Sequence, residues 1–146
     1  MGFRLWGVFC FAAFMSRDHT KLRAFQLADS LVITIYKETK NFPPEERYGL
    51  QSQIRRAAVS SASNLVEGSA RRGETEYLNF CNIACASAFE TRYLLDLAFR
   101  LGMLSPAANQ VLAPKLTHLC KSLVKLVIAL EEQVAVKRLG AQGLKP

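Results

Sequence analysis

The chain has 146 residues, half of them apolar, with only 8 Gly and 5 Pro. The length suits one domain with a core of its own, and the apolar content excludes a disordered chain. Nineteen Lys and Arg against twelve Asp and Glu give a formal net charge of +7. Such a balance is compatible with a nucleic acid or an acidic protein as partner. Because no strand–turn–strand pattern occurs, we expect an all-α fold.

The first fifteen residues, MGFRLWGVFCFAAFM, differ from the rest of the chain. Their apolar run over 5–14 is too short to span a bilayer as a helix. It has the length of a signal-peptide core, but no small-x-small cleavage site follows. We favour a third interpretation, an upstream start codon with Met15 as the natural first residue. The expected organisation is then a disordered leader over 1–15, a helical domain over 16–138 and a flexible tail over 139–146.

Two helices are expected in the first half of the domain. Apolar residues at helical spacing predict one over about 21–40. Pro43 and Pro44 stop it, since Pro43 disfavours helical geometry at the residue before it. Pro44 followed by two glutamates then suits the start of a second helix. Gly68 and Gly73 bracket the end of this second helix at about residue 70.

The second helix carries a polar row, Arg56, Ser60, Asn64 and Glu67, at i, i+4, i+8 and i+11. Small residues over 57–63 flank this row and let another helix come close. One interpretation is a solvated helix face. We favour the other, a hydrogen-bonded seam inside a helical assembly, because buried charge has to be paired.

The third helix, expected over about 74–101, carries two apolar stripes. The first stripe consists of Tyr77, Phe80, Cys81, Ala84, Ala88, Thr91, Leu95 and Ala98. The second consists of Ile83, Ser87, Glu90, Leu94, Leu97 and Leu101. Two stripes exceed what one bundle core requires, so the second predicts contact with another subunit. Glu90 on this stripe is a candidate partner for Arg55 or Arg56.

A fourth helix begins at Ser105 and Pro106, an N-cap followed by proline at the first position. Its apolar stripe continues as far as Val134. Pro114 lies inside this stripe and predicts a kink or a new helix start. Four helices with short connections predict an antiparallel up-down four-helix bundle.

Cysteine and histidine usage does not favour a metal site. Cys10, Cys81, Cys85 and Cys120 lack disulfide-scaffold spacing and have apolar neighbours, so packed thiols in a reducing cytoplasm are expected. A zinc set of the last three with His118 is the alternative. However, residues 118 and 120 point in different directions on a helix. We expect no metal and no other cofactor.

No catalytic motif is present: the sequence has no Gly-rich phosphate loop, no nucleophile elbow and no His-Glu-x-x-His. The protein is therefore expected not to be an enzyme and to have no catalytic residues. Basic residues are the remaining functional candidates, although helix capping or a solvated face also explains several of them. The candidate nucleic-acid-binding residues are Arg55, Arg71, Arg72, Lys121 and Lys125. The candidate residues of a structural seam are Arg56, Asn64, Glu67 and Glu90.

Several segments together resemble a known family. They are RDHTKL at 17–22, FPPEERYGL at 42–50, QIRRAA at 53–58 and NLVEG at 64–68, followed by Phe80, Ile83, Ala84, Ser87 and Glu90. The combination resembles the bacterial four-helix-bundle proteins, also called 23S ribosomal RNA intervening-sequence proteins, over about residues 17–135. Two positions depart from the family pattern. Ala86 stands where glycine is usual, and Arg92 stands where a second acid is frequent.

The resemblance implies four helices that assemble into a ring-shaped homopentamer, with no known enzymatic activity. Some members are encoded inside insertions in the 23S ribosomal RNA gene. The related accessory variability determinants of diversity-generating retroelements bind a reverse transcriptase and nucleic acid. Arg92 makes its face more positive and puts a salt-bridge seam there in doubt.

Two functional hypotheses follow from the sequence. The first is a non-enzymatic, cytoplasmic oligomeric scaffold that binds RNA or DNA, or a nucleic-acid-handling protein such as a reverse transcriptase, through a basic surface. The second is a pure protein–protein interaction module with no nucleic-acid contact, which uses the second apolar stripe of the third helix. Neither hypothesis involves a membrane.

Overall fold

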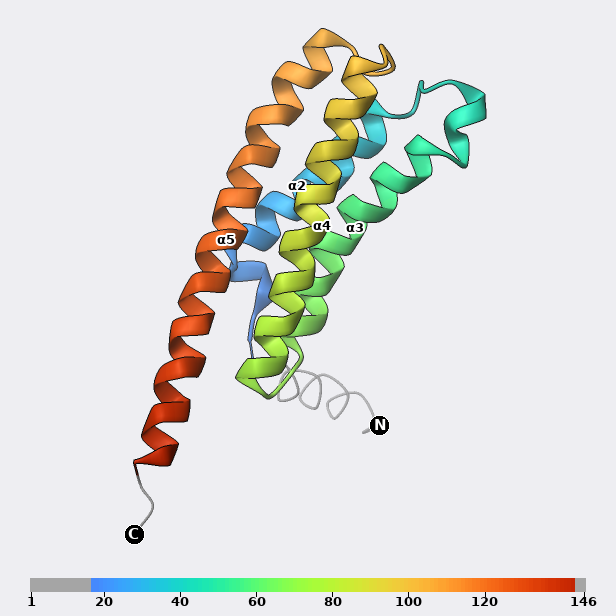
Figure 1. Ribbon diagram of the computed structural model, residues 1–146. Coiled ribbons are helices and arrows are strands. Elements are labelled where there is room, and N and C mark those ends of the chain that lie inside the picture. Colours follow the sequence, from blue (N-terminus) through green and yellow to red (C-terminus); the bar gives the residue numbers. More distant parts are fainter. Residues whose placement is uncertain (1–16, 144–146) are drawn as a thin grey trace, which may run out of the picture.

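The computed structural model describes residues 17–143, and the fold over this range is all-helical (Figure 1). Four long helices account for most of it: α2 (Arg23–Glu38), α3 (Leu50–Ser69), α4 (Glu74–Arg100) and α5 (Pro106–Gln142). Two short 3-10 helices, η1 (His19–Lys21) and η2 (Pro44–Arg47), precede α2 and α3. No strand occurs within 17–143, so the all-α prediction is confirmed for this range.

The long helices pack side by side as a four-helix bundle (Figure 1). The α2–α3 and α4–α5 connections lie at one end of the bundle, and the α3–α4 connection lies at the other. The C-terminal part of α5 continues past the α3–α4 connection and leaves the bundle. None of the helices within 17–143 combines the length and the apolar character needed to cross a bilayer.

The helix boundaries follow from capping and turn residues. Pro43 and Pro44 end the first helical stretch as expected, and η2 forms directly after them. The Glu46 carboxylate then accepts the backbone N–H of Leu50 at 2.8 Å, which satisfies one of the first donors of α3. The predicted second helix is therefore split into η2 and α3. Gly102, at φ 73°, supplies the left-handed conformation of the α4–α5 turn.

The core is formed by the facing stripes of all four helices. Its largest members with almost no exposed surface are Ile35, Ile54, Leu65, Leu112, Leu116 and Leu123. The first predicted stripe of α4 is buried throughout except at Phe80, which is half-buried. The second stripe is only partly exposed: Ser87 is buried and Leu94 packs against the core, whereas Ile83 is 49% exposed and Leu101 is 56% exposed.

Small residues bring α3 and α4 close together. Ala57 and Ser61 are buried at this contact, and the Ser61 hydroxyl donates to the carbonyl oxygen of Ala84 at 3.0 Å. At its far end, α3 presents Gly68 to Tyr77 and Phe80. The close approach expected from the small residues of 57–63 is thus made with α4 of the same chain.

Of the two outcomes expected at Pro114, a kink or a new helix start, the new start is wrong, and the two terminal predictions lie wholly or partly outside the described range. The α5 helix begins at Pro106 and runs unbroken through Pro114, so no new helix starts at this proline. It reaches Gln142, which makes the first residues of the predicted flexible tail helical. The predicted leader over 1–15 lies outside the described residues, as does the end of the tail over 144–146.

Candidate nucleic-acid interface

The connection between α2 and α3 forms a pocket of about 340 Å³. Thr39 ends α2, and the buried Phe42 anchors the chain before the two prolines turn it into η2. The returning α3 then brings its first turns back beside the end of α2. The pocket is lined by Lys40, Phe42, Pro43, Pro44, Arg47, Gln51 and Arg55.

Hydrogen bonds from α3 hold the end of α2 in place. Thr39 is fully buried, and its hydroxyl donates to the carbonyl oxygen of Ile35 at 2.7 Å. The amide of Gln51 donates to the Thr39 carbonyl oxygen. Because both groups are buried, losing either partner would leave a polar atom without compensation. The pocket therefore has a fixed inner wall.

Arg55 is positioned by the same helix end. Its Nε donates to the Thr39 hydroxyl oxygen at 3.0 Å, and one terminal nitrogen donates to the Tyr36 carbonyl oxygen at 3.3 Å. The guanidinium also lies 4.7 Å from the centre of the Tyr36 ring, a cation–π distance. These contacts hold the cation against the pocket, so little side-chain entropy remains to be lost when an anion binds.

The pocket has a uniformly positive charge. Lys40 and Arg47 are exposed and Arg55 is half-buried. No acidic side chain lines the pocket in the described part of the chain, and none of its three cations forms an ion pair there. Three neighbouring cations without a counter-charge raise the local potential and favour a bound anion.

The five predicted nucleic-acid-binding residues do not form one patch. Arg55 lies at the pocket, whereas Arg71 and Arg72 follow the end of α3, roughly 24 Å further along the bundle axis. Arg71 lies over the Phe80 ring at 4.8 Å, and its carbonyl oxygen accepts from Arg17 at 2.9 Å. The exposed Lys121 and Lys125 lie one turn apart on α5.

Sequence reasoning missed Lys40 and Arg47. Both stand on the flanks of the two prolines, a pair that had been interpreted only as the stop of one helix and the start of the next. The signal in the sequence is a basic residue on each side of the turn: Lys40 precedes the prolines and Arg47 follows them. Only the return of α3 brings Arg55 beside them.

The polar row of α3 lies along the outer edge of the α3–α4 contact. The Ser60 and Ser87 hydroxyls are 2.9 Å apart, and the Asn64 amide donates to the Ser60 carbonyl oxygen at 2.8 Å. Asn64 is half-buried, whereas Arg56 and Glu67 are exposed on the single chain. The inner part of the row is thus hydrogen-bonded within one protomer, and its charged ends face outward.

Neither arginine pairs directly with Glu90 in the described structure. Gln53 stands between them: it donates to the Glu90 carboxylate at 2.7 Å and accepts from Arg56. Arg55 points toward α2 instead. The predicted ion pair of Glu90 with Arg55 or Arg56 is therefore replaced, within the chain, by a link through an amide.

Three of the four cysteines lie within the described residues, whereas Cys10 lies outside them. Cys81 and Cys120 are buried and Cys85 is half-buried. Burial raises the pKa of the Cys81 thiol to about 11 and raises the pKa values of Cys85 and Cys120 as well. Within residues 17–143, no three His, Cys, Asp or Glu side chains come together in an arrangement that could hold a metal ion.

Comparison with known proteins places the chain in a family. The model of the 23S rRNA-intervening sequence protein family matches residues 20–125. A crystal structure of a protein with unknown function from the S23 ribosomal protein family of Bacteroides thetaiotaomicron is similar in fold. Its TM-score is 0.64 at 22% identity, and the match covers 71% of this chain and 97% of that one. No curated protein matches the chain. The chain belongs to the 23S rRNA-intervening sequence protein family.

Proposed function

We propose that the protein is a non-enzymatic oligomeric scaffold that binds RNA through the cationic pocket of Lys40, Arg47 and Arg55. The observation that carries this proposal is the charge of the pocket. Three basic side chains surround about 340 Å³ without an acidic lining residue in the described chain. The net charge of +7 adds a long-range attraction that steers a polyanion toward the surface.

The geometry suits a phosphate group of the RNA backbone. Arginine donors match the oxygen spacing of phosphate, and the fixed Arg55 provides one such donor group at the inner wall. Lys40 and Arg47 are exposed, so they can close around the anion from the outside. A pocket of this kind binds the phosphate backbone of the RNA and makes no contact with base edges. The affinity for RNA should therefore depend on salt concentration more than on RNA sequence.

Self-assembly is the second part of the proposal. Ile83 is exposed on α4, the helix that also carries the exposed Glu90, and Arg56 and Glu67 are exposed on the neighbouring α3. We propose that this surface joins copies of the antiparallel bundle into a ring homopentamer. A ring repeats the cationic pocket once per subunit, and several weak phosphate contacts on one RNA combine into tight binding.

The test compares three double variants that each remove two positive charges. Lys40→Gln with Arg47→Gln alters the pocket, Arg71→Gln with Arg72→Gln alters the α3–α4 connection, and Lys121→Gln with Lys125→Gln alters α5. Binding of a fluorescently labelled RNA hairpin is measured by anisotropy over a range of salt concentrations. Arg55 is left in place because it also holds the end of α2.

We expect the pocket variant to lose about tenfold or more in affinity, and its salt slope to fall by about two. The other two variants should show only the smaller effect of reduced net charge. Equal losses in all three would contradict a specific pocket and favour diffuse attraction. If the parent protein does not bind the RNA hairpin even at low salt, the proposed nucleic-acid function is wrong.

The second candidate function is a protein-interaction module without nucleic-acid contact. The exposed second stripe of α4 favours it, because an apolar surface of this kind can meet a foreign protein as well as a second copy. A nucleic-acid-handling protein such as a reverse transcriptase would be one such partner. Capture from a nuclease-treated lysate separates the two functions: a partner retained without RNA supports the module.

A further inference from the structure

A groove between α4 and α5 has no part in the proposed RNA contact. It has a volume of about 550 Å³, within the range of small-molecule sites. Its floor is formed by Leu95, Leu112 and Leu116, each at most 2% exposed. Ala113, an exposed residue of α5, contributes only a methyl group to the rim of the groove.

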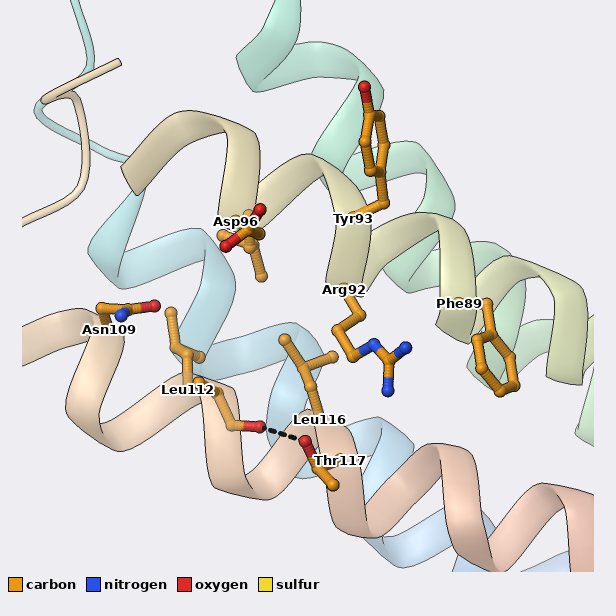
Figure 2. Close-up of a pocket in the computed structure, with 10 residues that line it drawn as sticks. Phe89, Arg92, Tyr93, Asp96, Asn109, Leu112, Leu116 and Thr117 are labelled. Atoms are coloured by element: carbon orange, nitrogen blue, oxygen red, sulfur yellow. Dashed lines mark hydrogen bonds between the residues drawn. The ribbon is translucent and has the colours of Figure 1, made fainter. Parts of the chain in front are cut away.

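Arg92 supplies the charge of the groove. Figure 2 shows its side chain extending from α4 toward α5, above Leu116 and Thr117. The guanidinium lies 5.0 Å from the centre of the Phe89 ring, which supports it from one side. Within residues 17–143 no carboxylate forms an ion pair with it.

The other charged residue of the groove, Asp96, forms an exposed ion pair with Arg100. The Asp96 carboxylate is 2.9 Å from Nε of Arg100, one turn further along α4. Asn109 faces the same space from α5, and the Thr117 hydroxyl donates to the Ala113 carbonyl oxygen at 2.9 Å. The groove thus combines an apolar floor with Arg92, a cation that forms no ion pair within 17–143, and has the paired Asp96 and neutral polar groups at its edge.

We propose that this groove binds a small amphipathic carboxylate, with the carboxylate on Arg92 and the apolar chain along the leucine floor. The carboxylate completes the charge-assisted hydrogen bonds that Arg92 lacks within the described chain. The apolar chain covers Leu112 and Leu116 and adds affinity with each methylene removed from water. The site is independent of the cationic pocket at the α2–α3 connection.

The test uses straight-chain fatty acids as probes and isothermal titration calorimetry as readout. Affinity should rise about fourfold per methylene from butanoate to octanoate, as the chain extends over the floor. Octanol and octylammonium have the same chain without the anion and should bind at least about tenfold more weakly than octanoate. Equal binding of all three octyl compounds would overturn the assignment of the carboxylate to Arg92.

Two variants probe the two parts of the site separately. Arg92→Gln removes the cation and should weaken octanoate binding about tenfold. Ala113→Leu fills the floor from an exposed position of α5 and should abolish binding while Arg92 stays in place. Arg23→Gln, an equal charge change at an exposed position of α2, serves as the control.

Far-UV circular dichroism establishes that each variant keeps the helical content of the parent. An octanoate affinity that is the same in Arg92→Gln and in Arg23→Gln overturns the proposal, as does one that Ala113→Leu leaves unchanged. RNA binding measured on the same variants should show at most the small effect of one lost positive charge, equal in Arg92→Gln and Arg23→Gln. The failure of the groove and the failure of the proposed function are therefore distinguishable.

Discussion

Gly68 determines how closely α3 and α4 approach each other. A Cβ atom at this position would lie 2.8 Å from Cβ of Phe80 and 3.1 Å from Cδ2 of Tyr77. The Phe80 Cβ is bonded directly to the α4 backbone, so it cannot yield without moving the helix. Gly140 on α5 offers a matched comparison, since a Cβ there would meet nothing within 4 Å.

We expect Gly68→Ala to lower the free energy of unfolding by about 1–2 kcal/mol, because overpacking outweighs the better helix propensity of alanine. Gly140→Ala should leave it unchanged or raise it by up to about 1 kcal/mol. Urea denaturation followed by circular dichroism measures both. A Gly68→Ala protein as stable as the parent would show that the helices can separate at no cost.

We expect the buried Tyr77 hydroxyl to cause a loss of folding stability at alkaline pH. Burial raises its pKa from 10.0 to about 12, with the neighbouring Cys81 as a smaller cause. As the pH rises above 10, the unfolded chain therefore loses the tyrosine proton before the folded chain does. The contribution of this group is fully present below pH 10 and is lost as the pH rises toward 12.

Tyr77→Phe keeps the ring and removes the titrating hydroxyl. The decline in unfolding free energy above pH 10 should be shallower in this variant than in the parent. Tyr93→Phe is the control, since the Tyr93 ring is 59% exposed and meets water in both states. Urea denaturation at a series of alkaline pH values measures the slope. Parallel curves for the parent and Tyr77→Phe would contradict the expectation.

Arg55 shows why single residues of the site were harder to predict than helices. Its position in a polar helix was visible in the sequence, and it was assigned to nucleic acid without its contacts. The structure gives it two structural acceptors on α2 and a place on the pocket wall. Helical periodicity cannot reveal a contact made across a turn, and for the same reason it missed Lys40 and Arg47.

At the scale of elements, the hydrophobic period predicted four helices and the buried stripe of α4. The spacing of apolar residues is a local property of each segment, and it stays the same when the helices pack together. The split of the second helix into η2 and α3 was missed, because the Glu46 side chain, and not a residue pattern, starts α3. Of the kink or new helix start expected at Pro114, the new start is wrong, since α5 continues through this exposed proline.

Replacing this proline should strengthen α5. Pro114→Ala restores a backbone N–H that can donate to the carbonyl oxygen of Gln110 and removes the steric conflict of the ring. The free energy of unfolding should rise by about 1–3 kcal/mol. Lys115→Ala at the next exposed position should change it by less than about 0.5 kcal/mol. A Pro114→Ala protein no more stable than the parent would show that α5 already adapts to the ring without strain.

At the scale of the whole molecule, the second stripe of α4 and the charged ends of the polar row share one outer surface. Arg56 and Glu90 are already linked through Gln53, so a second copy would meet partly satisfied polar groups. This lowers the cost of burying them compared with isolated charges. The apolar residues beside them then supply the gain in free energy on association.

Ile83→Glu places a charge in the middle of this surface and should dissociate the assembly while each bundle stays folded. The residue is 49% exposed on the single chain, so the substitution leaves the core intact. Light scattering should give five times the chain mass of 16.3 kDa for the parent and the chain mass itself for the variant. Leu139→Glu is the control, because Leu139 is 69% exposed on the part of α5 that leaves the bundle. A parent that already has the mass of one chain, or an Ile83→Glu variant that keeps the parental mass, would show that this surface does not join subunits.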